Sequence, residues 1–411
     1  MLRRLSSPVG AATALLVAAW SFVAFLPAFQ VWLYGDVRFY EGWANSITNH
    51  LVPYRDFKLE YPPGALPVFA LPTYARKALG YASTYYVWFR IEILVIALLA
   101  LWATAKALER LGASRRRMYW ALALSALAPA LLGPIALSRY DYWPTLFVIA
   151  GVAALVSDRP VLACAAFAAG AVAKVFPIVL LPFALFELWR RRRMRGVAWG
   201  LAATVAVVAV ALGPFVVLAP HGLTYAAHRQ ISRPLQIEST PAAVFVVAHE
   251  VGGAHLHVVK SAGSDNFAGS WPNRAATASG VLTAIALLGL YALYLRGRRG
   301  KDELVVACVA AVTAFVVFSK VFSPQYLVWL FPLVPLVGAR RGLRASLLFA
   351  LVVGLTQIWE PYRYGEYWHT FPAWISWLVV LRDLLVVVLL AVLVWPERER
   401  HRPAKYESVS A

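Results

Sequence analysis

The sequence predicts an all-α polytopic membrane protein, a helical bundle with about twelve transmembrane segments and a long outer loop after the first. The composition is 61% hydrophobic with only 14% charged residues, and the mean hydropathy is +0.65, which is typical of polytopic membrane proteins. Apolar runs tile nearly the whole chain, so we expect one transmembrane domain over residues 1–396 and no separate soluble domain. The net charge of +19 comes from short basic clusters between the apolar runs, a pattern typical of cytoplasmic loops rather than of nucleic-acid binding.

The first apolar run, residues 9–33, is long enough to span a bilayer and exceeds the hydrophobic region of a usual signal peptide. We expect residues 34–83 to follow as an outer loop. Within this loop, residues 65–80 are apolar but short and contain two prolines. That combination favours an interfacial or re-entrant helix.

Further apolar segments continue to the end of the domain. Four of them are too short to cross a bilayer upright, so we expect these to pack inside the bundle or to break near its outer face. Residues 220–276 should form a second outer loop. The predicted segments are 84–105, 118–137, 142–157, 160–173, 175–189, 197–219, 277–296, 303–319, 325–338, 343–359 and 372–395, and the short ones are 142–157, 160–173, 175–189 and 325–338.

The basic clusters set the predicted orientation. With the N-terminus inside, every cluster falls in the cytoplasm, in agreement with the positive-inside rule. The clusters occupy residues 106–117, 190–195, 296–301, 339–344 and the cytoplasmic tail 397–411. The same parity places the polar residues at the other helix ends on the outer face of the cell membrane.

The loop after the first span is the predicted catalytic loop. It is rich in acidic and aromatic residues and ends in YPPG, where two prolines and a glycine favour a sharp turn. Asp36, directly after the span, is the candidate catalytic residue. Tyr40, Glu41, Asp56 and Glu60 are further candidate site residues of this loop. The plain alternative is that these acidic residues cap helices, or that Asp56 and Glu60 pair with the neighbouring Arg55 and Lys58.

Cationic and polar residues follow at other outer helix ends. They suit contact with a phosphate group or a sugar, although a lysine at a helix C-terminus also interacts favourably with the helix dipole. Arg139 could instead pair with Asp141 and brace a turn. The candidates for binding a phosphate or a sugar are Lys320, Lys174, Arg139, Arg233, Gln325 and His228.

Metal and disulfide chemistry find little support in the sequence. The only cysteines, Cys164 and Cys308, lie inside apolar segments, which excludes a disulfide framework or a zinc site built on cysteine. His249, Glu250, His255 and His257 form no HExxH motif. No metal site is predicted.

Several motifs together resemble a known family. An acidic residue follows the first span, a loop ends PYRDFKLEYPPG, and KVFP at Lys174 is followed later by KVFSPQYLVWLFP at Lys320. Over residues 10–395 the chain is similar to the glycosyltransferase C superfamily, and within it to glycosyltransferase family 87. That family includes the polyprenol-phosphate-mannose-dependent mannosyltransferases of actinobacterial phosphatidylinositol mannoside synthesis.

The resemblance implies a glycosyltransferase C-type bundle, a lipid-linked sugar donor, and inverting transfer on the outer face with Asp36 in the position of the catalytic base. Position 38 is arginine, where other superfamily members carry the second aspartate of an Asp-x-Asp pair. No cofactor is therefore predicted, and a requirement for a divalent metal stays open.

The residue chemistry agrees with sugar transfer, because the reaction needs a carboxylate to accept the acceptor's proton and cations to stabilise the departing phosphate. The expected partners are a polyprenyl-phosphate-linked sugar donor, with mannose favoured, a glycolipid or glycan acceptor and membrane lipids, but no nucleic acid. Two other classes remain open. A twelve-span transporter or lipid flippase would place its charges near the membrane midplane, and a non-catalytic scaffold would leave the outer charges unexplained.

Overall fold

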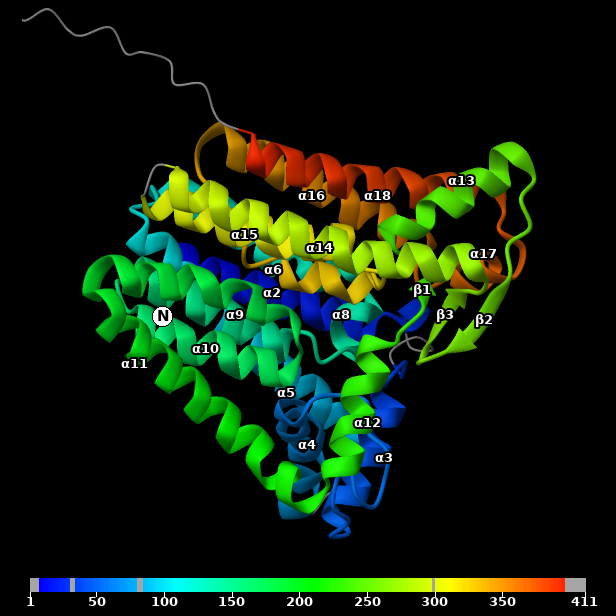
Figure 1. Ribbon diagram of the computed structural model, residues 1–411, viewed down its shortest axis with the longest axis horizontal. Helices are drawn as coiled ribbons and strands as arrows, with labels where there is room; N and C mark the ends of the chain where they lie inside the picture. Colours follow the sequence, from blue (N-terminus) through cyan, green and yellow to red (C-terminus); the bar gives the residue numbers. More distant parts are fainter. Residues whose placement is uncertain (1–6, 30–33, 80–83, 298–299, 396–411) are drawn as a thin grey trace, which may run out of the picture.

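The computed structural model describes residues 7–29, 34–79, 84–297 and 300–395, and it is a predominantly helical protein with one small sheet (Figure 1). The end of the predicted first span, at residues 30–33, and the predicted tail 397–411 lie outside the described residues. The chain is a multi-pass membrane protein, because several of its helices are long and strongly apolar.

Six helices in the described residues are long and apolar enough to cross a membrane. The count of about twelve stays a prediction, because the remaining predicted spans are shorter or broken, and one, α15 (Lys301–Phe318), begins with three charged residues. The six are α2 (Pro8–Phe25), α5 (Tyr85–Arg110), η3 with α11 (Phe176–Leu180 and Leu181–Leu218), α14 (Ser270–Arg296), α16 (Ala339–Trp359) and α18 (Ala373–Val394).

The segments predicted to be too short to cross are short or irregular in the structure. Residues 142–157 and 160–173 form α9 (Tyr142–Val156) and α10 (Pro160–Ala173), which pack closely against each other. Gly151 permits this approach, since a Cβ there would overlap the ring of Phe167. Residues 325–338 contain only the short turns η5 (Pro324–Trp329) and η6 (Val334–Leu336).

One other predicted span is interrupted by turns, and two more meet at a kink. Residues 118–137 form three short helices, α6 (Arg115–Ala126), α7 (Ala128–Leu132) and α8 (Pro134–Ser138), because prolines begin the second and third and Gly133 between them has a φ of 55°. The predicted spans 175–189 and 197–219 form η3 and the two parts of α11. These parts meet at a kink at Arg193, in the predicted basic loop, where the φ of 50° and ψ of −144° lie outside the helical region.

The loop after the first span contains α3 (Val37–Thr48), the turn η2 (Pro63–Ala65) and α4 (Leu66–Leu79). Helix α4 coincides with the short helix predicted at 65–80. The YPPG turn packs against α10: a Cβ at Gly64 would lie 2.6 Å from the backbone of Val172. Glycine is needed here because the two backbones approach so closely.

The second outer loop departs from the all-α prediction. It contains α12 (Pro220–Ile231), the turn η4 (Thr240–Ala242), α13 (Ala243–Gly252) and a small antiparallel sheet with strand order β1-β3-β2. The strands are β1 (Leu235–Gln236), β2 (Val258–Ser261) and β3 (Ser264–Phe267). Ala262 and Gly263, both with positive φ, form the two-residue turn between β2 and β3. The sheet and α17 (Tyr364–Thr370) share a small apolar core that includes Trp359.

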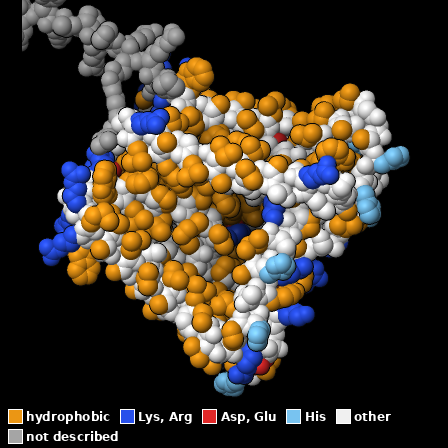
Figure 2. All heavy atoms as spheres, viewed as in Figure 1, with side chains coloured by type: hydrophobic (Ala, Val, Ile, Leu, Met, Phe, Trp, Pro, Cys, Tyr) orange, Lys and Arg blue, Asp and Glu red, His pale blue; other side chains and the backbone are white. Residues whose placement is uncertain are grey.

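The two ends of the bundle differ in character. At the end where α15 begins, on the left of Figure 1, the α9–α10 turn is joined to α11 and α15, because Asp158 pairs with Arg191 and Lys301. We call this the basic end, and Lys and Arg side chains are prominent along it in Figure 2. At the other, the loop end, Figure 1 shows α12, α13, α17 and the sheet. The described parts of the predicted clusters 190–195 and 296–301 therefore lie at the same end of the molecule.

Candidate active site

The predicted base is held by one of the predicted cations. Asp36 stands at the N-terminus of α3 but makes no capping hydrogen bond with its side chain. Its carboxylate instead forms an ion pair with the Arg139 guanidinium. Arg139 follows α8 in extended conformation, which ends that helix and directs the chain toward α9. The side chains of Asp36 and Arg139 remain 31% and 21% exposed, so solvent reaches the pair.

Asp141 has a different partner from the one the sequence suggested. The possible pairing of Arg139 with Asp141 was wrong: Asp141 Oδ1 lies 2.6 Å from Lys174 Nζ and accepts a hydrogen bond of 2.7 Å from Trp329 Nε1. The Asp141 side chain is only 2% exposed. The pair joins the start of α9 to the end of α10 and to η5.

Aromatic rings enclose the Lys174 ammonium. Its Nζ lies 5.1 Å from the ring centroid of Tyr140, 5.0 Å from that of Tyr326 and 5.2 Å from that of Trp329, distances typical of cation–π contacts. Lys174 is thus already neutralised by a carboxylate and surrounded by rings. This arrangement suits a structural role better than contact with a phosphate.

Arg233 and Lys320 are less firmly engaged. Lys320 Nζ donates a 2.6 Å hydrogen bond to the backbone carbonyl of Ile231, and Arg233 donates one of 3.1 Å to Ser264 Oγ. Burial and then the nearby positive charge of Arg233 lower the pKa of Lys320. Within the described residues, neither cation forms a salt bridge, so both retain charge for an anion.

The second outer loop is attached to this region through its backbone. The Gln236 N–H donates a 3.0 Å hydrogen bond to the Lys320 carbonyl, and Gln236 belongs to β1. Burial and, to a smaller extent, the positive charge of Arg233 lower the pKa of Lys174. The same charge opposes the rise that burial causes in the pKa of Tyr61. The candidates from four distant parts of the chain therefore lie near one another at the loop end.

The predicted acceptor residues already have partners within the protein, and that of Asp56 is local. Asp56 accepts hydrogen bonds from Arg55 Nε at 2.9 Å and from the Val52 N–H at 2.7 Å, as the plain alternative expected. Glu60 pairs at 2.9 Å with Arg229 of α12 rather than with a neighbour in sequence.

Two further residues of the predicted acceptor set, Tyr40 and Glu41, also lie in this loop. Tyr40 is 1% exposed and stacks on Phe69 with ring centroids 4.5 Å apart. Glu41 lies 3.8 Å from Arg76. His228 lies in the last turn of α12 and Gln325 in η5, and in the described part of the chain neither side chain has a hydrogen-bond partner.

A buried polar layer beside this site was missed. Arg382, in the middle of α18, is fully buried, donates a 2.9 Å hydrogen bond to the Glu238 carbonyl and lies 4.1 Å from the ring centroid of Phe322. It also pairs with Asp383 at 3.0 Å. The sequence could have indicated this layer, because two adjacent charged residues in the apolar run 372–395 are costly inside a membrane span unless they have partners.

Two carboxyl groups of this layer are strongly affected by burial. Glu238 is 3% exposed and accepts a 2.9 Å hydrogen bond from Gln236. Burial, followed by the charge of Glu360, raises its pKa well above the usual range. Burial also raises the pKa of Glu360 to about 7, an effect that Arg139 and Arg382 oppose. Arg139 therefore pairs with the Asp36 carboxylate and also opposes the rise in the pKa of Glu360. Nothing in the sequence around Glu238 signalled this.

The surface is hollowed in this region. Figure 2 shows an opening between α12 and α14, with Lys or Arg atoms at its edge and apolar side chains around it. The His249 group does not form a metal site: within the described residues no three His, Cys, Asp or Glu side chains are placed to hold a metal ion.

Comparison with known proteins gives one match. The family model of glycosyltransferase family 87 matches residues 59–324, which include the YPPG turn, Lys174, Arg233 and Lys320. Asp36 lies before the matched region. No curated protein matches the chain.

Proposed function

Because the chain belongs to glycosyltransferase family 87 and is a multi-pass membrane protein, we propose that it transfers a sugar, with mannose favoured, from a polyprenyl-phosphate donor to a lipid or glycan acceptor at the outer face, with inversion. The observation that carries this proposal is the Asp36–Arg139 pair, which sets a carboxylate beside a cation in the region of Arg233 and Lys320. Transfer from a lipid phosphate needs both kinds of group.

In the proposed reaction Asp36 is the general base. Its carboxylate accepts the proton of the acceptor hydroxyl while the hydroxyl oxygen attacks the anomeric carbon from the face opposite the phosphate. A new glycosidic bond forms, the bond between that carbon and the phosphate oxygen breaks, and the lipid phosphate leaves with the bonding electrons. Arg139 holds the Asp36 carboxylate in place, and its remaining N–H groups can face the phosphate.

The donor phosphate would be bound chiefly by Arg233 and Lys320. Both keep their charge unpaired within the described residues, whereas Lys174 is neutralised by Asp141. Gln325 and His228 would donate hydrogen bonds to the phosphate or the sugar. Of the proposed acceptor loop, Asp56, Glu60 and the buried Tyr40 would support the loop's shape, which leaves Glu41 as the residue best able to meet the acceptor.

The test is a transfer assay with the purified full-length protein and a panel of polyprenyl-phosphate-linked sugars. We expect product only when both a donor and a hydroxyl acceptor are present, with mannose transferred fastest. The rival transporter or flippase function would give movement of the donor lipid across vesicle membranes without any transfer. A scaffold protein would give neither signal.

A further inference from the structure

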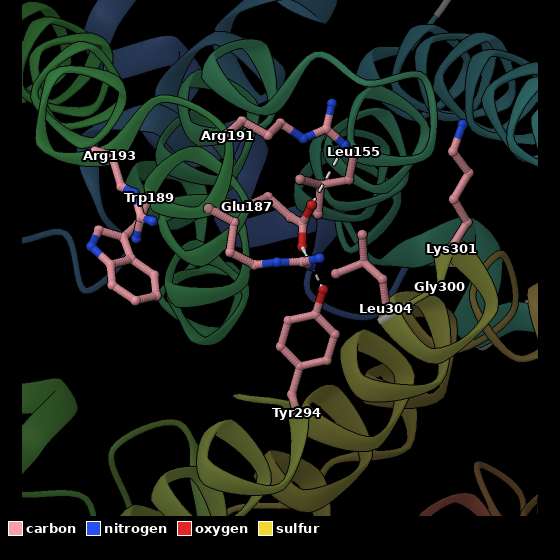
Figure 3. A pocket seen from close by; sticks show the side chains of 10 residues that line it. Leu155, Glu187, Trp189, Arg191, Arg193, Tyr294, Gly300, Lys301 and Leu304 are labelled. Carbon is pink, nitrogen blue, oxygen red and sulfur yellow. Dashed lines mark hydrogen bonds and ion pairs between the residues drawn. The ribbon is translucent and has the colours of Figure 1, made fainter. Parts of the chain in front are cut away.

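A second polar cavity lies at the basic end, away from the transfer site. Its volume is about 640 Å³ and it is formed by α9, α11, α14 and α15 (Figure 3). The polar side chains that line it are Glu187, Arg190, Arg191, Arg193, Tyr294 and Lys301. None of them belongs to the proposed reaction. A cavity of this size is within the range that holds a small organic ligand.

One buried carboxylate organises two of the arginines. Glu187, whose side chain is 8% exposed, accepts hydrogen bonds from Arg190 at 2.6 Å and from Tyr294 at 2.7 Å, and its other oxygen lies 3.5 Å from Arg191. Figure 3 shows these contacts meeting at Glu187 in the middle of the cavity. The guanidinium groups are thus held in fixed positions, which lowers the entropy lost when they bind a ligand.

The cavity carries more positive charge than its own carboxylates neutralise. Four cations line it, against three carboxylates: Glu187, the adjacent Asp158, which pairs with Arg191 at 2.6 Å and with Lys301 at 2.9 Å, and Glu303, which lies beside the lining residue Gly300. Arg193 has no acidic partner among the described residues and lies against the ring of Trp189, 5.5 Å from its centroid. An ion-pair network that served only to join the helices would be neutral, so the surplus charge points to an anion.

The shape of the site indicates a ligand larger than inorganic phosphate. In Figure 3, Arg193 and Trp189 lie on one side of Glu187 and Lys301 lies on the other. α11 is kinked at Arg193, so the backbone changes direction within the basic segment 190–195. Leu155, Leu304 and the half-exposed Trp189 complete the lining. Cations beside apolar and tryptophan side chains at the ends of spanning helices are where lipid headgroups meet acyl chains.

We propose that this cavity binds the headgroup of an anionic phospholipid, with the phosphate at Arg193, the rest of the headgroup extending toward Lys301, and the acyl chains along the apolar surface of α11. The ligand class follows from the surplus charge, the separation of the cations and the apolar wall. The site is independent of the sugar-transfer reaction and can be tested without measuring it.

The experiment uses the purified full-length protein in detergent, with lipid binding followed by native mass spectrometry. Dioleoyl phosphatidylglycerol is the anionic probe, and dioleoyl phosphatidylcholine and inorganic phosphate are the comparison ligands. The test variant is Arg193→Gln with Lys301→Gln. The matched control is Arg340→Gln with Arg344→Gln, which removes the same charge from exposed positions at the start of α16, at the same end of the bundle.

We expect the test variant to bind phosphatidylglycerol roughly 30-fold more weakly, since each Lys or Arg near an anionic lipid surface contributes roughly fivefold in affinity. The control should lose less than fivefold. Lys301→Gln alone, at a side chain that is 43% exposed, should fold normally and lose about fivefold. Equal loss in test and control variants would reduce the site to general surface charge. Equal binding of phosphatidylcholine would remove the anionic selectivity, and displacement of the lipid by inorganic phosphate would make this a small-anion site.

Discussion

Asp36 is defined by its partner as much as by its position. The ion pair with Arg139 fixes the carboxylate at the edge of the loop end while leaving it partly open to solvent. A base must keep a free lone pair for the incoming hydroxyl, and a carboxylate has enough acceptor sites for both contacts. This pair is where we expect the largest effect of a single substitution on the reaction.

Asp36→Asn keeps the size of the side chain but removes the proton acceptor. We expect transfer to fall roughly a hundred to ten-thousand fold, which is the usual contribution of general-base catalysis, with donor binding little changed. Turnover and donor affinity should be measured together. Asp56→Asn and Glu60→Gln are the controls, because both carboxylates already have partners in the loop. A fully active Asp36→Asn protein, beside an inactive Asp56→Asn protein, would move the base to position 56.

The two lysines that share a KVF motif should behave differently. Lys174→Met leaves Asp141 buried without its cation, and removing one partner of a buried pair typically costs about 3 to 5 kcal/mol. We therefore expect a large drop in thermal stability, partly restored by also changing Asp141→Asn. Lys320→Ala should leave stability nearly unchanged but weaken donor binding, and Lys320→Arg should recover part of it. A stable Lys174→Met protein with weak donor binding would reverse these roles.

Glu360 gives the protein a pH-dependent stability. Its pKa in the folded protein is raised to about 7 by burial, above the ordinary glutamate value. The folded state therefore holds a proton that the unfolded state releases. The stabilisation is complete below the unfolded pKa and is lost as pH rises through about 7. Melting temperatures measured from pH 5 to 8 should fall as pH rises, and Glu360→Gln should flatten that slope. An unchanged slope would mean that another group titrates.

At the scale of elements, the sequence predicted best the helices whose ends are marked by prolines or short polar turns. The predicted segments 142–157 and 160–173 correspond to α9 and α10 almost residue for residue, because Pro160 starts the second helix and a short polar turn separates the two. The predicted break inside the loop, with a short helix at 65–80, was equally local. Signals of this kind depend only on neighbouring residues.

Contacts between distant residues were not readable. Asp141 is two positions from Arg139, yet its partners are 33 and 188 residues away. Arg139 is extended at the end of α8, so the two side chains serve different neighbours. The sheet was missed for a related reason, since its strands are two to four residues long and too short for a clear alternation of polar and apolar positions.

At the scale of the whole molecule, the gathering of basic turns at one end agrees with the predicted orientation. Cysteine labelling in intact cells tests it. Positions 49, 114 and 260 are all exposed in the fold, so the side of the membrane on which each lies decides whether it is labelled. With an impermeant reagent, Asn49→Cys and Lys260→Cys should react and Ser114→Cys should not. The native cysteines, Cys164 and Cys308, are both buried and should stay silent. Labelling at position 114 alone would mean that the orientation is the reverse of the predicted one, which would place the proposed transfer site on the cytoplasmic side.

The burial of Arg382 has a consequence for how the protein is made. An arginine and an aspartate near the centre of a helix each reduce the tendency of that helix to enter the bilayer, by about 2.5 to 3.5 kcal/mol on insertion scales. The backbone carbonyl that receives Arg382 belongs to Glu238, and the ring beneath it to Phe322. Both are synthesised before α18, so the groups that contact Arg382 already exist when α18 leaves the ribosome.

We therefore expect α18 to enter the membrane inefficiently when it is fused alone to a reporter, and well when the reporter carries Arg382→Leu and Asp383→Leu. Efficient insertion of the unaltered segment would show that it needs no help. In the intact chain, α18 would enter the membrane by packing against segments that are already synthesised rather than by independent partitioning into lipid.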